Sequence, residues 1–85
     1  MKATLNITLQ GVSADYPVQL EPNVSDRDVK RIAVEVVRSG EVPGLHIGNL
    51  PENTFDMYVV DRFNNADGGV RLYLRPKVPF GDAAR

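Results

Sequence analysis

The stretch that decides the fold is SDRDVKRIAVEVVRSG, residues 25–40. Ser25 is a common helix N-cap type, and Asp28 lies at the spacing of a capping box. Apolar residues then recur at i, i+3, i+4, i+7 and i+8, which is one stripe of a helix. They are Val29, Ile32, Ala33, Val36 and Val37. Gly40 is the residue type that most often ends a helix. The pattern predicts an amphipathic helix from Asp26 to Ser39 with this stripe in the core.

Two runs of alternating polar and apolar residues precede the helix. The first has its apolar residues at Ala3, Leu5, Ile7 and Leu9. The second has them at Tyr16, Val18 and Leu20. Such alternation is typical of half-buried strands, and residues 11–15 between the runs have turn chemistry. Pro17 indicates the start of a strand or an edge strand, because proline has no amide to donate to a neighbour. We therefore expect an N-terminal β-hairpin.

Two more runs follow the helix, after an irregular stretch from Glu41 to Thr54 in which a short strand at 45–47 is weakly indicated. The first run covers residues 55–60, where Phe55, Met57 and Val59 alternate with Asp56, Tyr58 and Val60. The Asp67-Gly68 pair predicts a hairpin turn. The second run alternates Val70, Leu72 and Leu74 with Arg71, Tyr73 and Arg75. Proline 76 ends it.

The resulting order, β-β-α-β-β, predicts a two-layer α+β fold with a mixed four-stranded sheet packed on one helix. Because the helix carries the chain across the sheet, the first and last strands are expected to lie parallel in its middle. We expect one domain over residues 1–76 and a C-terminal tail over residues 77–85.

Composition excludes several classes of function. A chain of 85 residues forms one small domain, and its net charge of −1 argues against a duplex-DNA binder. The absence of cysteine excludes disulfides, thiolate nucleophiles and cysteine-based metal sites. No apolar run is long enough for a membrane span, and no secretory signal is recognisable. The expectation is a cytoplasmic protein with no nucleic-acid or membrane partner.

Catalytic and metal motifs are weak. His46 is the single histidine, and nothing in the sequence places a serine and a carboxylate beside it. Residues 63–74 lack the terminal acidic ligands of an EF-hand loop. We expect no enzyme activity and no cofactor.

The order and lengths of these elements resemble the β-grasp fold of ubiquitin and its relatives. The passage VQLEPNVSDRDVK, residues 18–30, resembles the ubiquitin-like entry into the helix, and VRLYLR, residues 70–75, resembles the final strand. The tail has a single Gly81 after Phe80, where the familiar pattern is Gly-Gly, and four residues follow it. The middle region departs from the family pattern.

The resemblance implies a ubiquitin-like protein modifier, of the prokaryotic kind encoded beside its enzymes. Its partners would be activating and conjugating enzymes, a deconjugating protease and target proteins. The chain would be cut after Gly81, with Phe80 as a side chain for an enzyme to grip, and joined to a target amine. ATP and the thioester cysteine would belong to the enzymes.

The outward side of the last strand is the candidate docking surface. Arginine and tyrosine are enriched at interface hot spots, which selects Arg71, Tyr73 and Arg75. Tyr58 and Val60 would extend this surface if Met57 and Val59 point inward. Each candidate has an alternative without function. The outward side of the last strand would be an ordinary solvated face, and the C-terminal tail would be a frayed chain end.

Three other functions stay open. The first is a non-covalent adaptor of the same fold, which would not need its tail. The second is a sulfur carrier, against which the missing Gly-Gly counts. The third is a small enzyme, for which the chain offers few groups.

Overall fold

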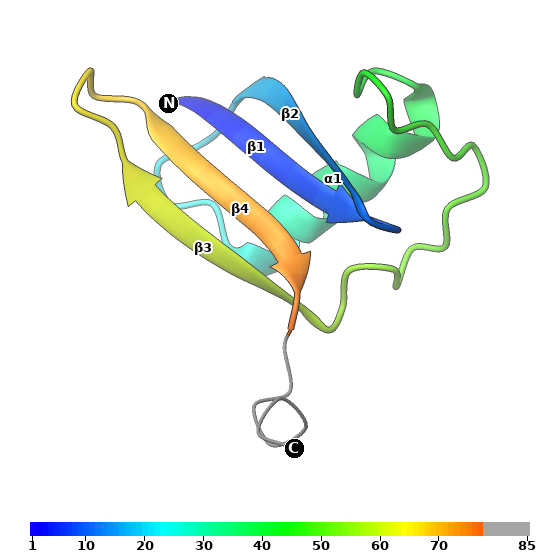
Figure 1. Cartoon of the computed structure of the whole chain (residues 1–85). Helices are drawn as coiled ribbons and strands as arrows, with labels where there is room; N and C mark the ends of the chain where they lie inside the picture. Colours follow the sequence, from blue (N-terminus) through cyan, green and yellow to red (C-terminus); the bar gives the residue numbers. More distant parts are fainter. Residues whose placement is uncertain (78–85) are drawn as a thin grey trace, which may run out of the picture.

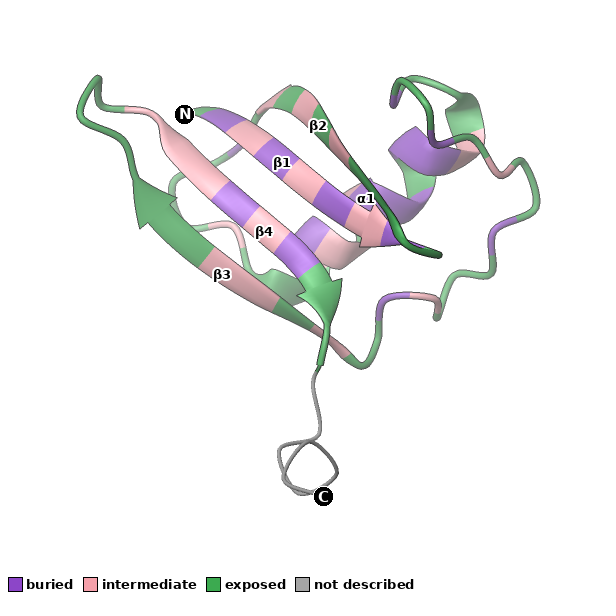
Figure 2. Cartoon of the chain, viewed as in Figure 1, coloured by how far each residue is buried: buried purple, intermediate pink, exposed green. Residues whose placement is uncertain are grey.

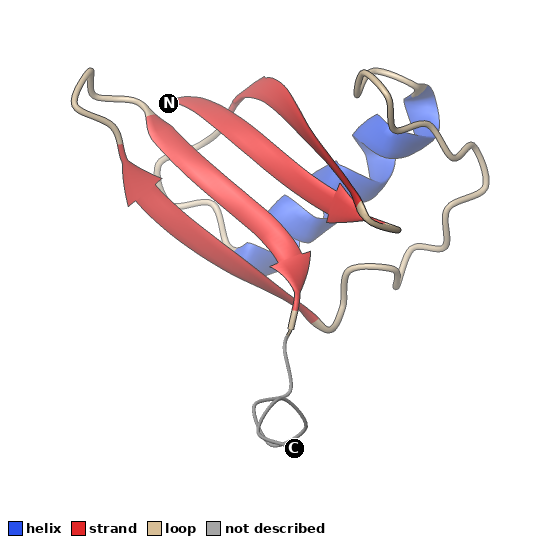
Figure 3. Cartoon of the chain, viewed as in Figure 1, coloured by secondary structure: helices blue, strands red, loops and turns tan. Residues whose placement is uncertain are grey.

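The computed structural model describes residues 1–77. In chain order it contains β1 (Lys2–Leu9), β2 (Val12–Gln19), α1 (Asp26–Ser39), β3 (Tyr58–Asn64) and β4 (Val70–Pro76). The four strands form one layer and α1 lies across one face of it (Figures 1 and 3). This two-layer α+β arrangement confirms the predicted β-grasp order. No helix in the described part of the chain has the length and apolar character needed to cross a membrane.

Helix α1 begins and ends where its capping residues predict. The Ser25 side chain accepts a hydrogen bond from the Asp28 amide at 3.1 Å. At the other end Gly40 has φ 79°, in the left-handed region where glycine carries no Cβ penalty. The Gly40 amide donates to the Val37 carbonyl and the next amide donates to the Val36 carbonyl. These two bonds form a Schellman motif, which satisfies carbonyls that the helix itself leaves unpaired.

The sheet has the strand order β2-β1-β4-β3. Strands β1 and β4 lie parallel at its centre, with Leu5 opposite Leu72 and Ile7 opposite Leu74. The outer pairs, β1 with β2 and β3 with β4, are antiparallel. The predicted parallel centre is confirmed, and Pro17 lies on an edge strand as expected.

The second strand is longer than predicted. Strand β2 begins at Val12, directly opposite Leu9, so Gln10 and Gly11 alone form the turn. Both have positive φ, 52° and 78°, which is the conformation of a two-residue type I′ hairpin. The prediction of a turn over residues 11–15 was wrong, because glutamine rarely signals a left-handed position.

The third strand begins later than predicted. Phe55 lies in a turn segment, where the Tyr58 amide donates to its carbonyl, and β3 runs from Tyr58 to Asn64. The weakly indicated strand at 45–47 is absent from the described structure, and residues 41–57 form a chain of turns. On the helix side, Arg62 Nη2 donates to the Val24 carbonyl at 2.8 Å and to Asp26 Oδ1 at 2.7 Å. This contact fixes β3 to the start of α1.

The core lies between the sheet and α1, where buried positions alternate along β1 and β4 (Figure 2). On the helix the buried residues are Val29, Ala33, Val34, Val36 and Val37. Ile32 is half-buried at the border of the core, and Val34 takes a buried place that the stripe did not include. Turn residues also contribute, because the connection packs Val42, Leu45, Leu50 and Phe55 into the same cluster.

Candidate functional site

The side of the sheet opposite α1 carries an aromatic and charged cluster on β3 and β4. Its members are Val59, Asp61, Phe63, Arg71, Tyr73 and Arg75, which we call the sheet-face cluster. Antiparallel register places Phe63 opposite Arg71, Asp61 opposite Tyr73 and Val59 opposite Arg75. Because directly opposed residues share a face, the predicted Arg-Tyr-Arg row and three β3 residues lie together, on the face away from α1.

Tyr73 is the centre of this cluster. The Phe63 ring meets it edge-on, with ring centroids 5.5 Å apart and an interplanar angle of 82°. The guanidinium carbons of Arg71 and Arg75 lie 5.2 and 5.7 Å from its ring centroid. Arg71 Nε also donates to the Tyr73 hydroxyl at 2.8 Å. Edge-to-face and cation–π contacts each add to stability, so they hold the tyrosine in one orientation.

Both arginines have acidic partners on the same face. Arg71 Nη2 reaches across β1 to Asp15 on β2, at 2.8 and 3.0 Å from its two carboxylate oxygens. Arg75 Nε donates to Asp61 Oδ2 at 3.1 Å. The pKa of Asp15 is lowered, first by the hydrogen bond from the Asn6 amide and then by Arg71. The face is therefore close to electrically neutral, and its arginines are held in place before any partner arrives.

The apolar part of the cluster is exposed. Phe63 is 53% exposed and Val59 is 39% exposed, although both are large hydrophobic residues. Between the aromatic rings and arginines lies an open hollow of about 440 Å³ lined by Phe63, Asn65, Arg71, Tyr73 and Arg75. Large apolar side chains beside fixed arginines are typical of recognition surfaces.

The expected extension of this surface by Tyr58 and Val60 is wrong. Val60 lies opposite buried Leu74 in the β3–β4 register, so both point toward α1. Tyr58 packs edge-on against buried Phe55, with ring centroids 4.8 Å apart. The inward residues of this strand are therefore 58, 60 and 62, and Val59 points outward. Met57 precedes the strand and is 77% exposed.

Sequence reasoning missed Val59, Phe63 and the two aspartates. An available signal was the spacing of Val59, Asp61 and Phe63, which share one side of any strand that continues to Asn64. The predicted strand ended at Val60, so Asp61 and Phe63 were not recognised as members of the same row. The ion pair between Asp15 and Arg71 joins positions 56 residues apart, so no local sequence pattern predicts it.

Other groups with chemical potential are dispersed. His46 Nε2 lies 3.1 Å from the Arg38 carbonyl, at the end of α1, and its ring packs beside Gly40. Among residues 1–77, no three histidine, aspartate or glutamate side chains are grouped to hold a metal ion. Phe80 and Gly81, the predicted processing residues, lie outside the described residues.

Comparison with protein-family models, curated proteins and solved structures gives no match.

Proposed function

We propose that this chain is a ubiquitin-like β-grasp protein that acts by binding other proteins through its sheet-face cluster. The observation that carries the proposal is the exposed Phe63 ring packed on a fixed Tyr73. The arginines beside them are already paired with Asp15 and Asp61. A partner gains most by covering the apolar rings, because the charges need no new counter-ion.

Paired substitutions test this surface. The Phe63→Ala/Tyr73→Ala variant removes both rings from the face. Val12→Ala is a matched control, because Val12 is 43% exposed but lies on β2 opposite Leu9, away from the cluster. A partner captured by the wild-type chain is purified and titrated calorimetrically. We expect at least a tenfold loss of affinity in the ring variant, about 1.4 kcal/mol, and none in the control. Equal affinities would contradict the proposal.

A finer form of the proposal is that the chain is a protein modifier conjugated through Gly81. Its support is the ubiquitin-like order of elements and the place where β4 ends. Pro76 and Lys77 are exposed at the end of a central strand, so the described part of the chain ends at the surface. A protease would hydrolyse the Gly81–Asp82 bond. An activating enzyme would then adenylate the Gly81 carboxylate with ATP, releasing pyrophosphate, and its cysteine would displace AMP to form a thioester. After transfer to the conjugating enzyme, the target amine would attack this thioester and release the enzyme thiol.

Intact mass tests this form. The chain is expressed together with a protease and an activating enzyme encoded by neighbouring genes, and the loss of residues 82–85 is measured. Gly81→Val is expected to slow that loss, because a side chain crowds the attacked carbonyl. A full-length mass in the presence of both enzymes would remove the modifier form. The adaptor form would then stand, in which deletion of residues 78–85 leaves partner affinity unchanged.

A further inference from the structure

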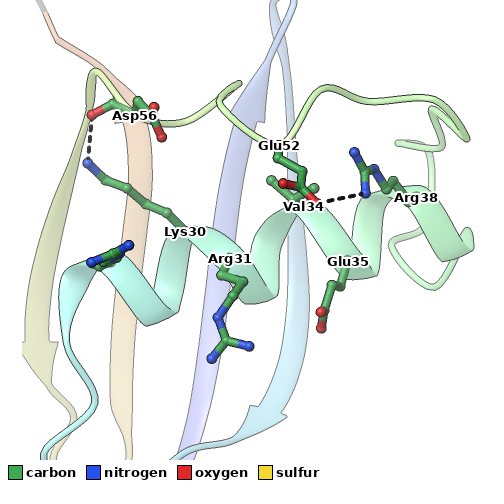
Figure 4. A pocket seen from close by; sticks show the side chains of 8 residues that line it. Lys30, Arg31, Val34, Glu35, Arg38, Glu52 and Asp56 are labelled. Carbon is green, nitrogen blue, oxygen red and sulfur yellow. Dashed lines mark hydrogen bonds and ion pairs between the residues drawn. The ribbon is translucent and has the colours of Figure 1, made fainter.

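A hollow lies beside α1, on the opposite side of the molecule from the sheet-face cluster. The helix and the turn segment around Glu52 and Asp56 enclose a hollow of about 310 Å³. Figure 4 shows Lys30 and Arg38 at its two ends, with Val34 between them. These three residues are spaced i, i+4 and i+8, so they form one row along the helix.

The cations of this row are poorly neutralised. Lys30 Nζ donates to the Asp56 carbonyl at 3.0 Å, and Arg38 Nε donates to the Leu50 carbonyl at 2.6 Å. Both acceptors are neutral. The carboxylate of Glu52 stands 4.0 Å from Arg38 Nη1, and its side chain is 88% exposed. The sheet-face arginines, in contrast, contact their carboxylates at hydrogen-bond distance.

Two further cations, Arg27 and Arg31, line the same hollow. Arg31 pairs with Asp28 at 3.3 Å, but its side chain is 65% exposed. The lining thus holds four basic groups against the carboxylates of Glu35, Glu52 and Asp56. Surface pairs this exposed contribute little stability, so an incoming carboxylate can replace Glu52 at small cost.

We propose that this hollow binds an extended acidic peptide segment of a partner protein. Its pattern is two acidic residues separated by any three residues. A helix rises 1.5 Å per residue, so Lys30 and Arg38 are separated by about 12 Å along the axis. An extended chain rises about 3.3 Å per residue and points every second side chain the same way. Its first and fifth residues therefore span about 13 Å and meet the two cations.

Fluorescence anisotropy with a labelled synthetic peptide, Gly-Glu-Ser-Leu-Ser-Glu-Gly, tests the proposal on the full chain. We expect saturable binding, and at least tenfold weaker binding when glutamine replaces both glutamates of the peptide. Lys30→Gln/Arg38→Gln is expected to weaken binding at least tenfold. The control Lys2→Gln/Lys77→Gln makes the same charge change away from the hollow and is expected to change affinity less than twofold.

Glu52→Gln keeps the test decisive if the double variant loses its fold. This substitution removes the carboxylate that competes for Arg38, and its exposed position leaves the core intact. It is expected to tighten peptide binding at least twofold. Three results would each overturn the proposal: no binding, an equal loss in the lysine control, or equal binding of an oligonucleotide with the same charge. The last would indicate a general anion surface.

Discussion

Phe55 is expected to be the most important core residue outside the helix and strands. It is fully buried in a turn segment, and it packs edge-on against Tyr58. Replacing a buried phenylalanine by alanine removes its apolar transfer energy and leaves a cavity, which costs about 3–5 kcal/mol. A domain of this size is stable by about 5–10 kcal/mol. Phe55→Ala therefore removes a large share of the free energy of unfolding.

Urea denaturation followed by circular dichroism measures this loss. With an m-value of about 1 kcal/mol/M for so small a protein, the midpoint is expected to fall by about 3 M or more. Met57→Ala is the matched control, two residues along and 77% exposed, and its stability is expected to stay within about 0.5 kcal/mol of wild type. Similar losses in the two variants would refute the reasoning, because they would mean that both side chains point inward, as simple alternation predicts.

Three further tests address the helix, its cap and the sheet face. Ala33→Asp places a carboxylate at a fully buried position and is expected to abolish cooperative thermal unfolding. Ile32→Asp, at the half-buried border, should retain a folded state. If Ile32→Asp unfolds the chain and Ala33→Asp does not, the helix is rotated about its axis. Gly40→Ala puts a Cβ at φ 79° and 3.4 Å from the His46 ring. It is expected to cost about 1–2 kcal/mol in a thermal melt, whereas Gly48→Ala, 3.9 Å from the same ring, should cost less. Asp15 has a lowered pKa in the folded chain, so its stabilising contribution is complete above the unfolded pKa of about 3.9 and is lost as the pH falls through the folded pKa. Urea melts should show wild type more stable than Asp15→Asn at pH 7, with the difference shrinking below about pH 4. A difference independent of pH would contradict the Asn6 and Arg71 contacts.

The helix was predictable to its ends because its boundaries are set by local chemistry. Ser25 and Gly40 act through hydrogen bonds to residues within one turn, so the sequence around them contains the whole interaction. Strands β1 and β4 were predictable for a similar reason. They lie at the centre of a sheet with one covered face, and their alternation records that difference in environment.

The edges of the sheet were harder to predict. In β3, apolar residues occupy both faces, since Val59 points outward and Val60 points toward α1. Period-two alternation then carries no information about which side is buried. The register with β4 decides it, and that register depends on pairing across the hairpin at 65–69. Phe55 misled the prediction because a turn residue reached the core.

The sequence also predicts only part of the electrostatics of the two surfaces, namely where their charged side chains lie. The outward position of Arg71 and Arg75 follows from the β4 alternation, but their neutralisation depends on strand order. Because β2 and β4 flank β1, Asp15 comes within reach of Arg71. On α1 the helix periodicity places Lys30 and Arg38 in one row, yet their neutral acceptors come from the turn segment at 50–56. Arginines thus belong to a nearly neutral aromatic face on the sheet and to a hollow on the helix whose lining has four basic and three acidic groups. If both surfaces bind, salt should weaken binding at the hollow far more than at the sheet-face cluster, since screening acts on uncompensated charge.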